Sequence, residues 1–233
     1  MTTIPMKELT RMAEPKFVPL EGYVQFDDTE MAERAAALFA QMDRRRTVRE
    51  FSDEPVPRAV IEDCLRVANT APSGANMQPW HFTVISDPEM KRRVREAAEA
   101  EEREFYEHRA SDEWLEALAK FGTDANKPFL ETAPYLIAIF MQKFAVDDDG
   151  NKTKHYYPQE SVGLATGMLV AALHQCGLAS LTHTPSPMAF LNEICERPKH
   201  ERAFLLLVVG KPAEDATVPA ISRKTLETFT DFR

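Results

Sequence analysis

The sequence contains few of the features that mark secreted, zinc-binding or membrane proteins. Its three cysteines, Cys64, Cys176 and Cys195, are odd in number and lack CxxC spacing, so neither a disulfide scaffold nor a zinc site is indicated. No apolar run reaches the ~20 residues that cross a bilayer. The N-terminus also lacks the basic segment and apolar core of a signal peptide. We therefore expect a cytoplasmic protein without a membrane segment.

Positive charge is also scarce. The chain has 28 Lys+Arg against 37 Asp+Glu, a formal net charge of -9. A nucleic-acid backbone would be repelled by most of such a surface, which argues against a nucleic-acid partner. The sequence shows no GxSxG elbow, no acid/base pair and no metal-ligand cluster, so we expect no bound metal. The composition, 44% hydrophobic and 28% charged, is that of an ordinary globular protein.

One segment concentrates the positive charge that the rest of the chain lacks. Residues 44–49 read Arg-Arg-Arg-Thr-Val-Arg, which places four arginines in six positions. The planar guanidinium matches phosphate oxygens, and the threonine hydroxyl can add one more hydrogen bond. Alternatively, the first three arginines form the cationic end of the preceding helix, where they interact favourably with its dipole. The rest of the chain favours the first interpretation, a site for a small anionic ligand.

Apolar patterning predicts helices separated by short strands, which favours an α/β or α+β domain. Helices are expected from residue 29 to the arginine segment and at 57–69, 87–109, 111–121, 159–175 and 187–196, and strands at 80–85, 135–141, 179–182 and 203–209. Residues 1–27 are predicted to form an arm that wraps a partner, and residues 28–233 a single domain whose tail spans about 213–233.

Two of the expected helices have features that suggest a role. The helix at 87–109 has sparse apolar residues, so most of its surface should face water or a removable neighbour, as in a lid. The helix at 159–175 carries Gly163 and Gly167 four residues apart, a spacing that permits close approach of a second helix. We interpret it as a central core helix or a dimer helix.

A loop with small residues precedes the first strand. It reads Ala-Pro-Ser-Gly-Ala over residues 71–75 and continues through Gln78-Pro79-Trp80. Small residues allow backbone amides to approach a flat ligand closely. Taken in isolation, an ordinary connecting loop explains the same residues.

Together these pieces resemble the flavin-dependent nitroreductase superfamily, and within it the branch that removes halogen reductively from halotyrosines. The resemblance covers nearly all of residues 43–228. The motifs that carry it are Arg45-Arg46-Thr47-Val48-Arg49, the loop at 71–80, His155-Tyr156-Tyr157, Arg197-Pro198-Lys199-His200-Glu201, Val209-Gly210-Lys211-Pro212, Ala216-Thr217-Val218-Pro219 and Arg223. It implies an α+β fold of three layers, with a central mixed sheet flanked by helices and extended termini embracing a dimer partner. The animal members of the branch carry an N-terminal membrane anchor, which we do not expect here.

The resemblance also implies FMN as the cofactor and assigns residues to it. The FMN-binding set would be Arg45, Arg46, Thr47, Arg49, Pro72, Ser73, Gly74, Thr182, His183, Thr184 and Arg223. In this set Arg45 and Arg223 would hold the phosphate. Arg49 would lie near the pyrimidine edge and stabilise the negative charge of the reduced flavin. Thr184 would be catalytic, since a hydroxyl near flavin N5 favours single-electron transfer over hydride transfer. His183 stands where the animal enzymes have a threonine.

Three further residues would recognise the substrate. In the halotyrosine branch a Glu, a Tyr four residues later and a Lys beyond them clamp the ammonium and carboxylate of the amino acid. Glu102, Tyr106 and Lys127 match them, and the i, i+4 spacing of the first two places them on one helix face. The amide of Ala75 would contact the phenolate oxygen. Without the FMN motifs, Glu102 and Lys127 would be interpreted as surface charges and Tyr106 as a packing residue.

The resemblance thus predicts a homodimeric FMN enzyme that dehalogenates halotyrosine at sites in the subunit interface, under a lid at about 100–127. The alternatives are a general NAD(P)H-dependent nitroreductase or quinone reductase that transfers hydride, and a flavin-binding protein without turnover. The sequence contains no GxGxxG fingerprint and leaves the electron donor open. A separate NAD(P)H-dependent reductase is one candidate.

Overall fold

The computed structural model describes residues 15–147 and 149–233, so residues 1–14, the first half of the predicted arm, lie outside the described residues. The chain divides into two units, residues 1–40 and 41–233. The predicted domain starts at residue 28, whereas the larger compact unit starts at Gln41. Helix α1 (Asp28–Asp43) accounts for the difference, since none of its residues is buried. Its first turn is capped by the Asp27 carboxylate, which accepts from the amide of Glu30 at 2.9 Å.

A four-stranded antiparallel sheet organises the larger unit. Its strand order is β1-β2-β6-β5, with bounds β1 (Trp80–Ile85), β2 (Tyr135–Gln142), β6 (Glu201–Gly210) and β5 (Ala179–His183). An isolated parallel bridge between Thr47 and Ser180 adds a parallel contact at the β5 edge. This bridge brings the arginine segment against the strand that carries the predicted threonines.

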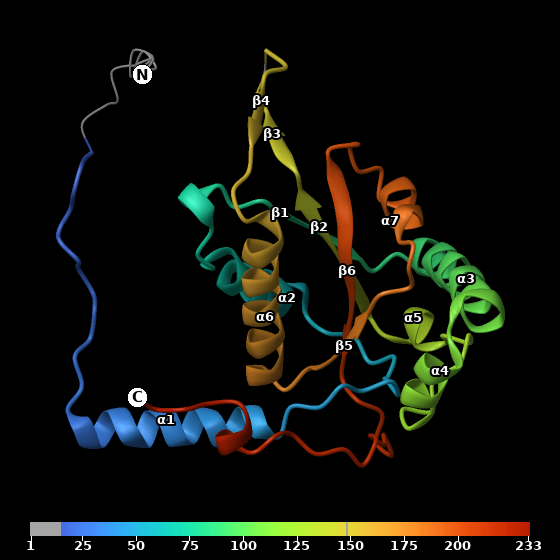
Figure 1. Ribbon diagram of the computed structural model, residues 1–233, viewed down its shortest axis with the longest axis horizontal. Coiled ribbons are helices and arrows are strands. Elements are labelled where there is room, and N and C mark those ends of the chain that lie inside the picture. Colours follow the sequence, from blue (N-terminus) through green and yellow to red (C-terminus); the bar gives the residue numbers. More distant parts are fainter. Residues whose placement is uncertain (1–14, 148) are drawn as a thin grey trace, which may run out of the picture. The chain divides into compact units, whose positions relative to one another are not determined.

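Helices cover both faces of the sheet (Figure 1). The apolar run of β2 explains this arrangement, because successive side chains of a strand point to opposite faces. Ile137 and Ile139 pack with α2 (Arg58–Asn69) and α6 (Pro158–Gln175). Leu136 and Phe140 pack on the other face with residues of α3 (Pro88–Glu104), α5 (Phe129–Thr132) and α7 (Ala189–Ile194). The predicted α+β fold of three layers is confirmed.

Helix α3 differs from the prediction made for residues 87–109. It begins at an Asp87 cap and a first-turn proline, as expected, but it ends at Glu104 and continues as one π-helical turn, η2 (Phe105–Arg109). One face of the helix is buried, since Val94 and Ala98 are fully buried and the charged Lys91 and Glu99 are buried with them, while Glu89, Arg92, Arg93 and Glu96 are exposed. Lys91 is compensated by donating to the carbonyl oxygens of Glu131 and Ala133 at 2.7 and 2.9 Å. Only the end of this helix and the following residues are available for a lid.

The predicted glycine stripe of α6 lies exposed. A Cβ added to Gly163 or Gly167 would meet no atom of the described residues within 4 Å. Leu164 beside them is 52% exposed. The opposite side of α6 is buried through Val162, Leu169 and others against the sheet and α2. The helix is therefore a core helix on one side, and its small-residue side borders an open cavity that Arg45, Thr47 and Thr182 also line.

The remaining elements are short. They are η1 (Gly74–Asn76), α4 (Asp112–Ala119), β3 (Phe144–Val146), β4 (Lys152–Lys154) and η3 (Leu226–Thr228). Strands β3 and β4 form a separate antiparallel hairpin. Among residues 15–147 and 149–233, we find no helix with the length and hydropathy of a membrane span.

Candidate active site

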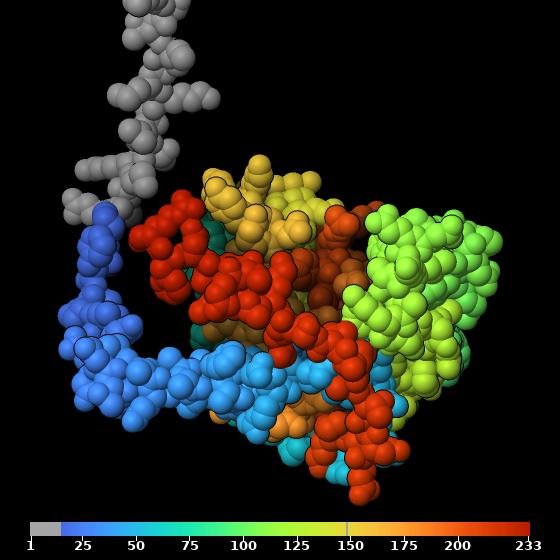
Figure 2. Space-filling model, turned by 60° about the horizontal axis from the view of Figure 1, so that its bottom comes forward, coloured from blue at the N-terminus to red at the C-terminus, as the bar shows by residue number. Residues whose placement is uncertain are grey.

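The C-terminal tail folds back onto the arginine segment. The Arg223 guanidinium donates to the carbonyl and carboxylate oxygens of Asp43, both at 2.9 Å, and to the carbonyl of Arg45 at 2.6 Å. Arg46 in turn donates to the carbonyl oxygen of Pro219. Residues almost 180 positions apart thus meet, as the sequence predicts for Arg45 and Arg223. Figure 2 shows the tail (red) running across one face of the molecule to the green segment around residue 120.

These contacts create a pocket with a strong excess of positive charge. It has a volume of about 470 Å³, and its lining includes Arg45, Arg46, Thr47, Arg49, Ser222 and Arg223. Partial burial, and next the charges of Arg223 and Arg46, lower the pKa of Arg45. A lowered arginine pKa means that the guanidinium groups repel one another in a partly desolvated place. An anion bound between them would remove this repulsion, so the pocket fits a phosphate group.

A second cavity adjoins the arginine pocket. It has a volume of about 480 Å³ and shares Arg49, Leu181 and Thr182 with the first. Aromatic and apolar side chains from the lid region line one side of it: Phe105, Tyr106, Trp114 and Leu118. Phe105 contacts the rings of both Tyr106 and Trp114 edge-on, with centroid distances of 5.4 and 4.9 Å. The π-helical turn places Phe105 and Tyr106 next to this cavity, directly after the end of α3.

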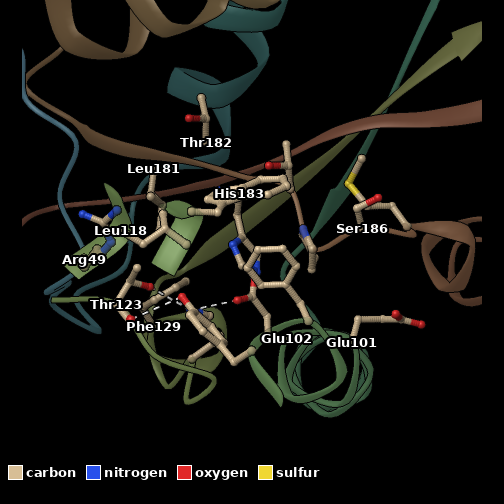
Figure 3. Close-up of a pocket in the computed structure, with 17 residues that line it drawn as sticks. Arg49, Glu101, Glu102, Leu118, Thr123, Phe129, Leu181, Thr182, His183 and Ser186 are labelled. Atoms are coloured by element: carbon tan, nitrogen blue, oxygen red, sulfur yellow. Dashed lines mark hydrogen bonds and ion pairs between the residues drawn. The ribbon is translucent and has the colours of Figure 1, made fainter. Parts of the chain in front are cut away.

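The three residues predicted to clamp an amino acid meet in this second cavity (Figure 3). Lys127 Nζ lies 3.4 Å from the Glu102 carboxylate, and their side chains are only 3% and 13% exposed. Lys127 Nζ also donates to Thr123 Oγ1 at 2.9 Å and to the carbonyl of Asp124. The Tyr106 hydroxyl donates to the carbonyl of Thr123 at 3.2 Å. Glu102 and Lys127 are therefore not surface charges, and the clamp residues form one cluster.

Burial works against both charges of this ion pair. It raises the pKa of Glu102, although Lys127 opposes the shift, and it lowers the pKa of Lys127, although Glu102 opposes that shift. Both directions show that desolvation outweighs the attraction within the pair. A ligand with one positive and one negative group would supply each buried charge with a second partner. The cluster is therefore matched to a zwitterion.

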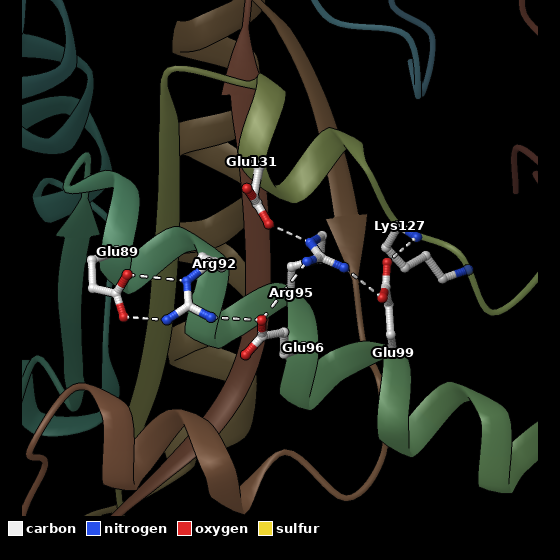
Figure 4. Close-up of polar contacts among 7 residues, drawn as sticks. All are labelled: Glu89, Arg92, Arg95, Glu96, Glu99, Lys127 and Glu131. Atoms are coloured by element: carbon white, nitrogen blue, oxygen red, sulfur yellow. Dashed lines mark hydrogen bonds and ion pairs between the residues drawn. The ribbon is translucent and has the colours of Figure 1, made fainter.

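A network that the sequence did not reveal positions Lys127 (Figure 4). The Glu99 carboxylate is buried and accepts the backbone amide of Lys127 at 2.8 Å. Arg95 holds the other oxygen of Glu99 at 2.7 Å and also bonds Glu131 on α5. Glu99 and Glu102 are three residues apart on α3, so one helix face fixes both the backbone and the charge partner of Lys127. The spacing of Arg95 and Glu99 at i, i+4 was visible in the sequence, but their tertiary partners were not.

Thr182, His183 and Thr184, at the end of β5 and directly after it, all line the second cavity. Thr182 and Thr184 are exposed, whereas His183 between them is buried. Figure 3 shows Thr182 and His183 pointing in different directions. His183 packs edge-on against Phe129 at 5.8 Å, and its Nε2 has no hydrogen-bond partner among the described residues. Burial, with Lys127 and Arg49 nearby, lowers the pKa of His183 to about 3, so its imidazole is neutral.

The loop at Pro72–Ala75 does not join the other predicted site residues within one chain. It lies beside the start of α6, where Gly74 packs so closely on Tyr156 that an added Cβ would stand 2.5 Å from its carbonyl oxygen. Ala75 and Asn76 adopt left-handed conformations with φ of 51° and 53°. Such strained non-glycine residues are frequent at functional sites. Figure 1 shows η1 well away from α4 and the lid region.

The described residues contain no group of three or more His, Cys, Asp or Glu side chains that could hold a metal ion.

Comparison with known proteins agrees with this arrangement. The model of the nitroreductase family matches residues 42–211. The chain therefore belongs to the nitroreductase family, a family of flavin-dependent oxidoreductases.

Within the family the similarity points to one kind of enzyme. The chain is 56% identical over 211 residues to an iodotyrosine deiodinase from Haliscomenobacter hydrossis, covering 91% of this chain and 95% of that protein. It is 43% identical over 210 residues to the iodotyrosine deiodinase of Nematostella vectensis, covering 88% and 80%. Its structure matches a crystal structure of oxidized iodotyrosine deiodinase bound to FMN and 3-iodo-L-tyrosine, with a TM-score of 0.71 and 33% identity, over 84% of this chain and all of that one.

Proposed function

We propose that this protein binds FMN and catalyses the reductive dehalogenation of halotyrosines, with iodotyrosine converted to tyrosine and iodide. The observation that carries the proposal is the buried Glu102–Lys127 pair in a cavity that shares Arg49, Leu181 and Thr182 with the arginine pocket. A site for a zwitterion thus lies directly beside a site for a phosphate-bearing cofactor. The similarity to deiodinases, one of them solved with FMN and 3-iodo-L-tyrosine, supports the same assignment.

The cofactor would be held mainly by the arginine pocket. Arg45 and Arg223 bind the phosphate, which relieves the repulsion that lowers the pKa of Arg45. Arg46 and Thr47 line the same pocket, and Arg49 stands between it and the second cavity, where a cation stabilises negative charge on the pyrimidine ring. Reduced FMN would supply the two electrons that the reaction consumes, in single-electron steps.

The substrate would be oriented by its amino-acid part. Glu102 binds the ammonium group and Lys127 binds the carboxylate. The Tyr106 hydroxyl lies beside them, since it bonds Thr123, which is also a partner of Lys127. The aromatic ring of the substrate packs against the apolar side chains of the lid, which exclude water from the cavity. In the reaction the carbon–halogen bond breaks, halide leaves, and the ring carbon takes up a proton. Thr182 borders both cavities and Thr184 lines the second one, and Thr184 is the residue we propose as catalytic.

A second copy of the chain would complete the site. The loop with Pro72, Ser73, Gly74 and Ala75 lines neither of the two cavities of its own chain. The left-handed backbone of Ala75 and the close packing of Gly74 on Tyr156 hold the loop in one defined conformation, as expected of a ligand-binding loop. The exposed Gly163 and Gly167 stripe of α6 offers a face for close helix packing. We therefore propose a homodimer in which the loop of one chain faces the cavities of the other, with the amide of Ala75 on the substrate's phenolate. His183, buried between Thr182 and Thr184 and packed on Phe129, lines the second cavity with them and would contribute to this wall of the site.

Replacing Arg223 should release the cofactor. Arg223→Ala removes a phosphate ligand and the contacts that hold the tail to Asp43 and Arg45. Loss of a charge-assisted hydrogen bond is expected to weaken FMN binding about 10- to 100-fold. The flavin-to-protein absorbance ratio after gel filtration measures this. Arg202→Ala, which removes an exposed arginine of β6 outside the arginine pocket, is the control. A fully yellow Arg223→Ala protein would contradict the assignment.

Replacing Glu102 should affect the substrate and not the cofactor. Glu102→Gln keeps the shape of the side chain but loses the charge that faces the ammonium group. We expect kcat/KM for 3-iodotyrosine to fall about 10- to 100-fold. The reduction of an uncharged nitroaromatic by the same variant should change little, and FMN should stay bound. If both reactions declined equally, the enzyme would be a general nitroreductase without a zwitterion clamp.

The effect of Glu102 should depend on pH in a defined direction. Because burial raises the pKa of Glu102 above its ordinary value of 4.5, the carboxylate takes up its proton at a higher pH than an exposed glutamate. The ratio of halotyrosine affinities between the wild type and Glu102→Gln should therefore be largest near neutral pH and approach one as pH falls through the raised pKa. Titrations of flavin fluorescence at several pH values measure the ratio. A ratio that keeps its neutral-pH value as the pH is lowered to 4.5 would be inconsistent with this role.

The dimer can be tested on the glycine stripe. Leucines at both positions, Gly163→Leu with Gly167→Leu, find open space in the single chain but would block close packing of a second helix. We expect sedimentation to show a monomer at micromolar concentration, with FMN lost. The control is Arg93→Leu, which adds an exposed leucine on α3. An intact dimer in the doubly substituted protein would show that this face is not the interface.

A further inference from the structure

Two cysteines that are distant in sequence lie in contact on the side of the molecule formed by α2 and α6. The Cys64 and Cys176 sulfurs are 3.9 Å apart, although the residues are separated by 112 positions. Cys64 stands in the middle of α2, on the buried face with Ile61 and Ala68. Cys176 is the C-terminal cap of α6, and its residue is exposed. Neither cysteine lines the cavities described above.

We propose that Cys64 and Cys176 form a reversible disulfide on exposure to hydrogen peroxide, which links α2 to the end of α6. The bonded sulfurs of a disulfide are about 2.05 Å apart. The Cys64 and Cys176 sulfurs, now 3.9 Å apart, therefore have to approach each other by about 1.9 Å. Cys176 can supply the movement. Helix α6 ends there, and Gly177 follows with φ of 78°, so the Cys176 side chain is not constrained by a continuing helix. Cys64 is held in place by the packing of α2 on α6.

The exposure of the two cysteines decides which of them reacts with peroxide first. The Cys176 thiolate attacks one peroxide oxygen, the O–O bond breaks, and hydroxide leaves, which gives a sulfenic acid on Cys176. The Cys64 sulfur then attacks the Cys176 sulfur, the S–O bond breaks, and the Cys64 proton and the departing hydroxide form water. Two thiols have lost two electrons, and one peroxide has become two waters. Cys64 does not start the reaction, because it is 2% exposed, and burial beside Cys176 raises its pKa to about 12.

Neither the proposed dimer interface nor the third cysteine interferes with the pairing of Cys64 and Cys176. Cys176 lies nine residues after Gly167, two and a half helical turns, so it is on the opposite side of α6 from the glycine stripe. The proposed dimer interface therefore leaves Cys176 free. Cys195 packs with the helices on the other face of the sheet and has no partner cysteine there among the described residues.

The disulfide would close a loop of more than a hundred residues that contains β1, the whole lid region and β2. Cross-links that close long loops stabilise a protein mainly by restricting its unfolded chain. The melting temperature is therefore expected to rise by roughly 5–15 °C on oxidation and to return on treatment with a dithiol.

The test is to treat the FMN-loaded protein with a small excess of hydrogen peroxide and then count its thiols after unfolding. We expect the count to fall from three to one per chain, with a Cys64–Cys176 cross-linked peptide found by mass spectrometry and Cys195 still reduced. The melting temperature should rise as stated. Cys195→Ser should show the same cross-link, with the count falling from two to none.

The variant Cys64→Ser separates the pair from a merely exposed thiol. Its Cys176 should oxidise to sulfenic or sulfinic acid without any rise in melting temperature. Three unchanged thiols in the wild type, oxidation of Cys176 alone, or a Cys176–Cys176 link between two chains on a non-reducing gel would each overturn the proposal.

Discussion

The buried ion pair between Glu102 and Lys127 is the interaction on which the functional part of this molecule depends. Removing two charges from water is unfavourable unless each finds further partners, and a broken buried pair leaves an uncompensated charge. The chain meets this requirement on one side, through Thr123, Asp124 and the Glu99 carboxylate that binds the amide of Lys127. The other side of the pair faces the cavity. The fold thus holds two opposite charges ready for a ligand that carries the complementary two.

A second electrostatic constraint complements the first. The tail brings Arg223 to an arginine segment that starts almost 180 residues earlier, although the charges repel one another enough to lower the pKa of Arg45. Hydrogen bonds to the backbone carbonyls of Asp43, Arg45 and Pro219, together with an ion pair between Arg223 and the Asp43 carboxylate, hold this arrangement. Arg49 and Thr182 border both cavities, which places the proposed cofactor and substrate in contact. The order of elements in the fold therefore explains why the family's motifs are scattered from residue 45 to residue 223.

The sequence allowed much of this to be predicted, for physical reasons that differ between elements. Continuous apolar runs located β2 and β6, and local patterning located α2, α3 and α6, while the three-layer α+β fold was implied by the resemblance. The convergence of Arg45 with Arg223, and that of Glu102, Tyr106 and Lys127, was predicted from a resemblance and agrees with the geometry.

Other features depend on tertiary contacts that no local pattern shows. Lys91 and Glu99 are charged residues in a charged helix, and only their bonds to α5 and to the amide of Lys127 make their burial favourable. The π-helical turn after Glu104 interrupts what appears as one long helix. His183 is buried although Thr182 and Thr184 on either side of it are exposed, and no residue of the loop at Pro72–Ala75 lines either cavity of its own chain. The contact of Cys64 with Cys176 depends on the packing of α2 on α6.

The most direct test of the account is a single anaerobic titration. The FMN-loaded protein is reduced chemically, 3-iodotyrosine is added, and flavin absorbance is followed while tyrosine and iodide are assayed. The account predicts that the flavin is reoxidised with one tyrosine and one iodide formed for each flavin. A flavin that stays reduced with iodotyrosine, yet is reoxidised by a nitroaromatic, would contradict it.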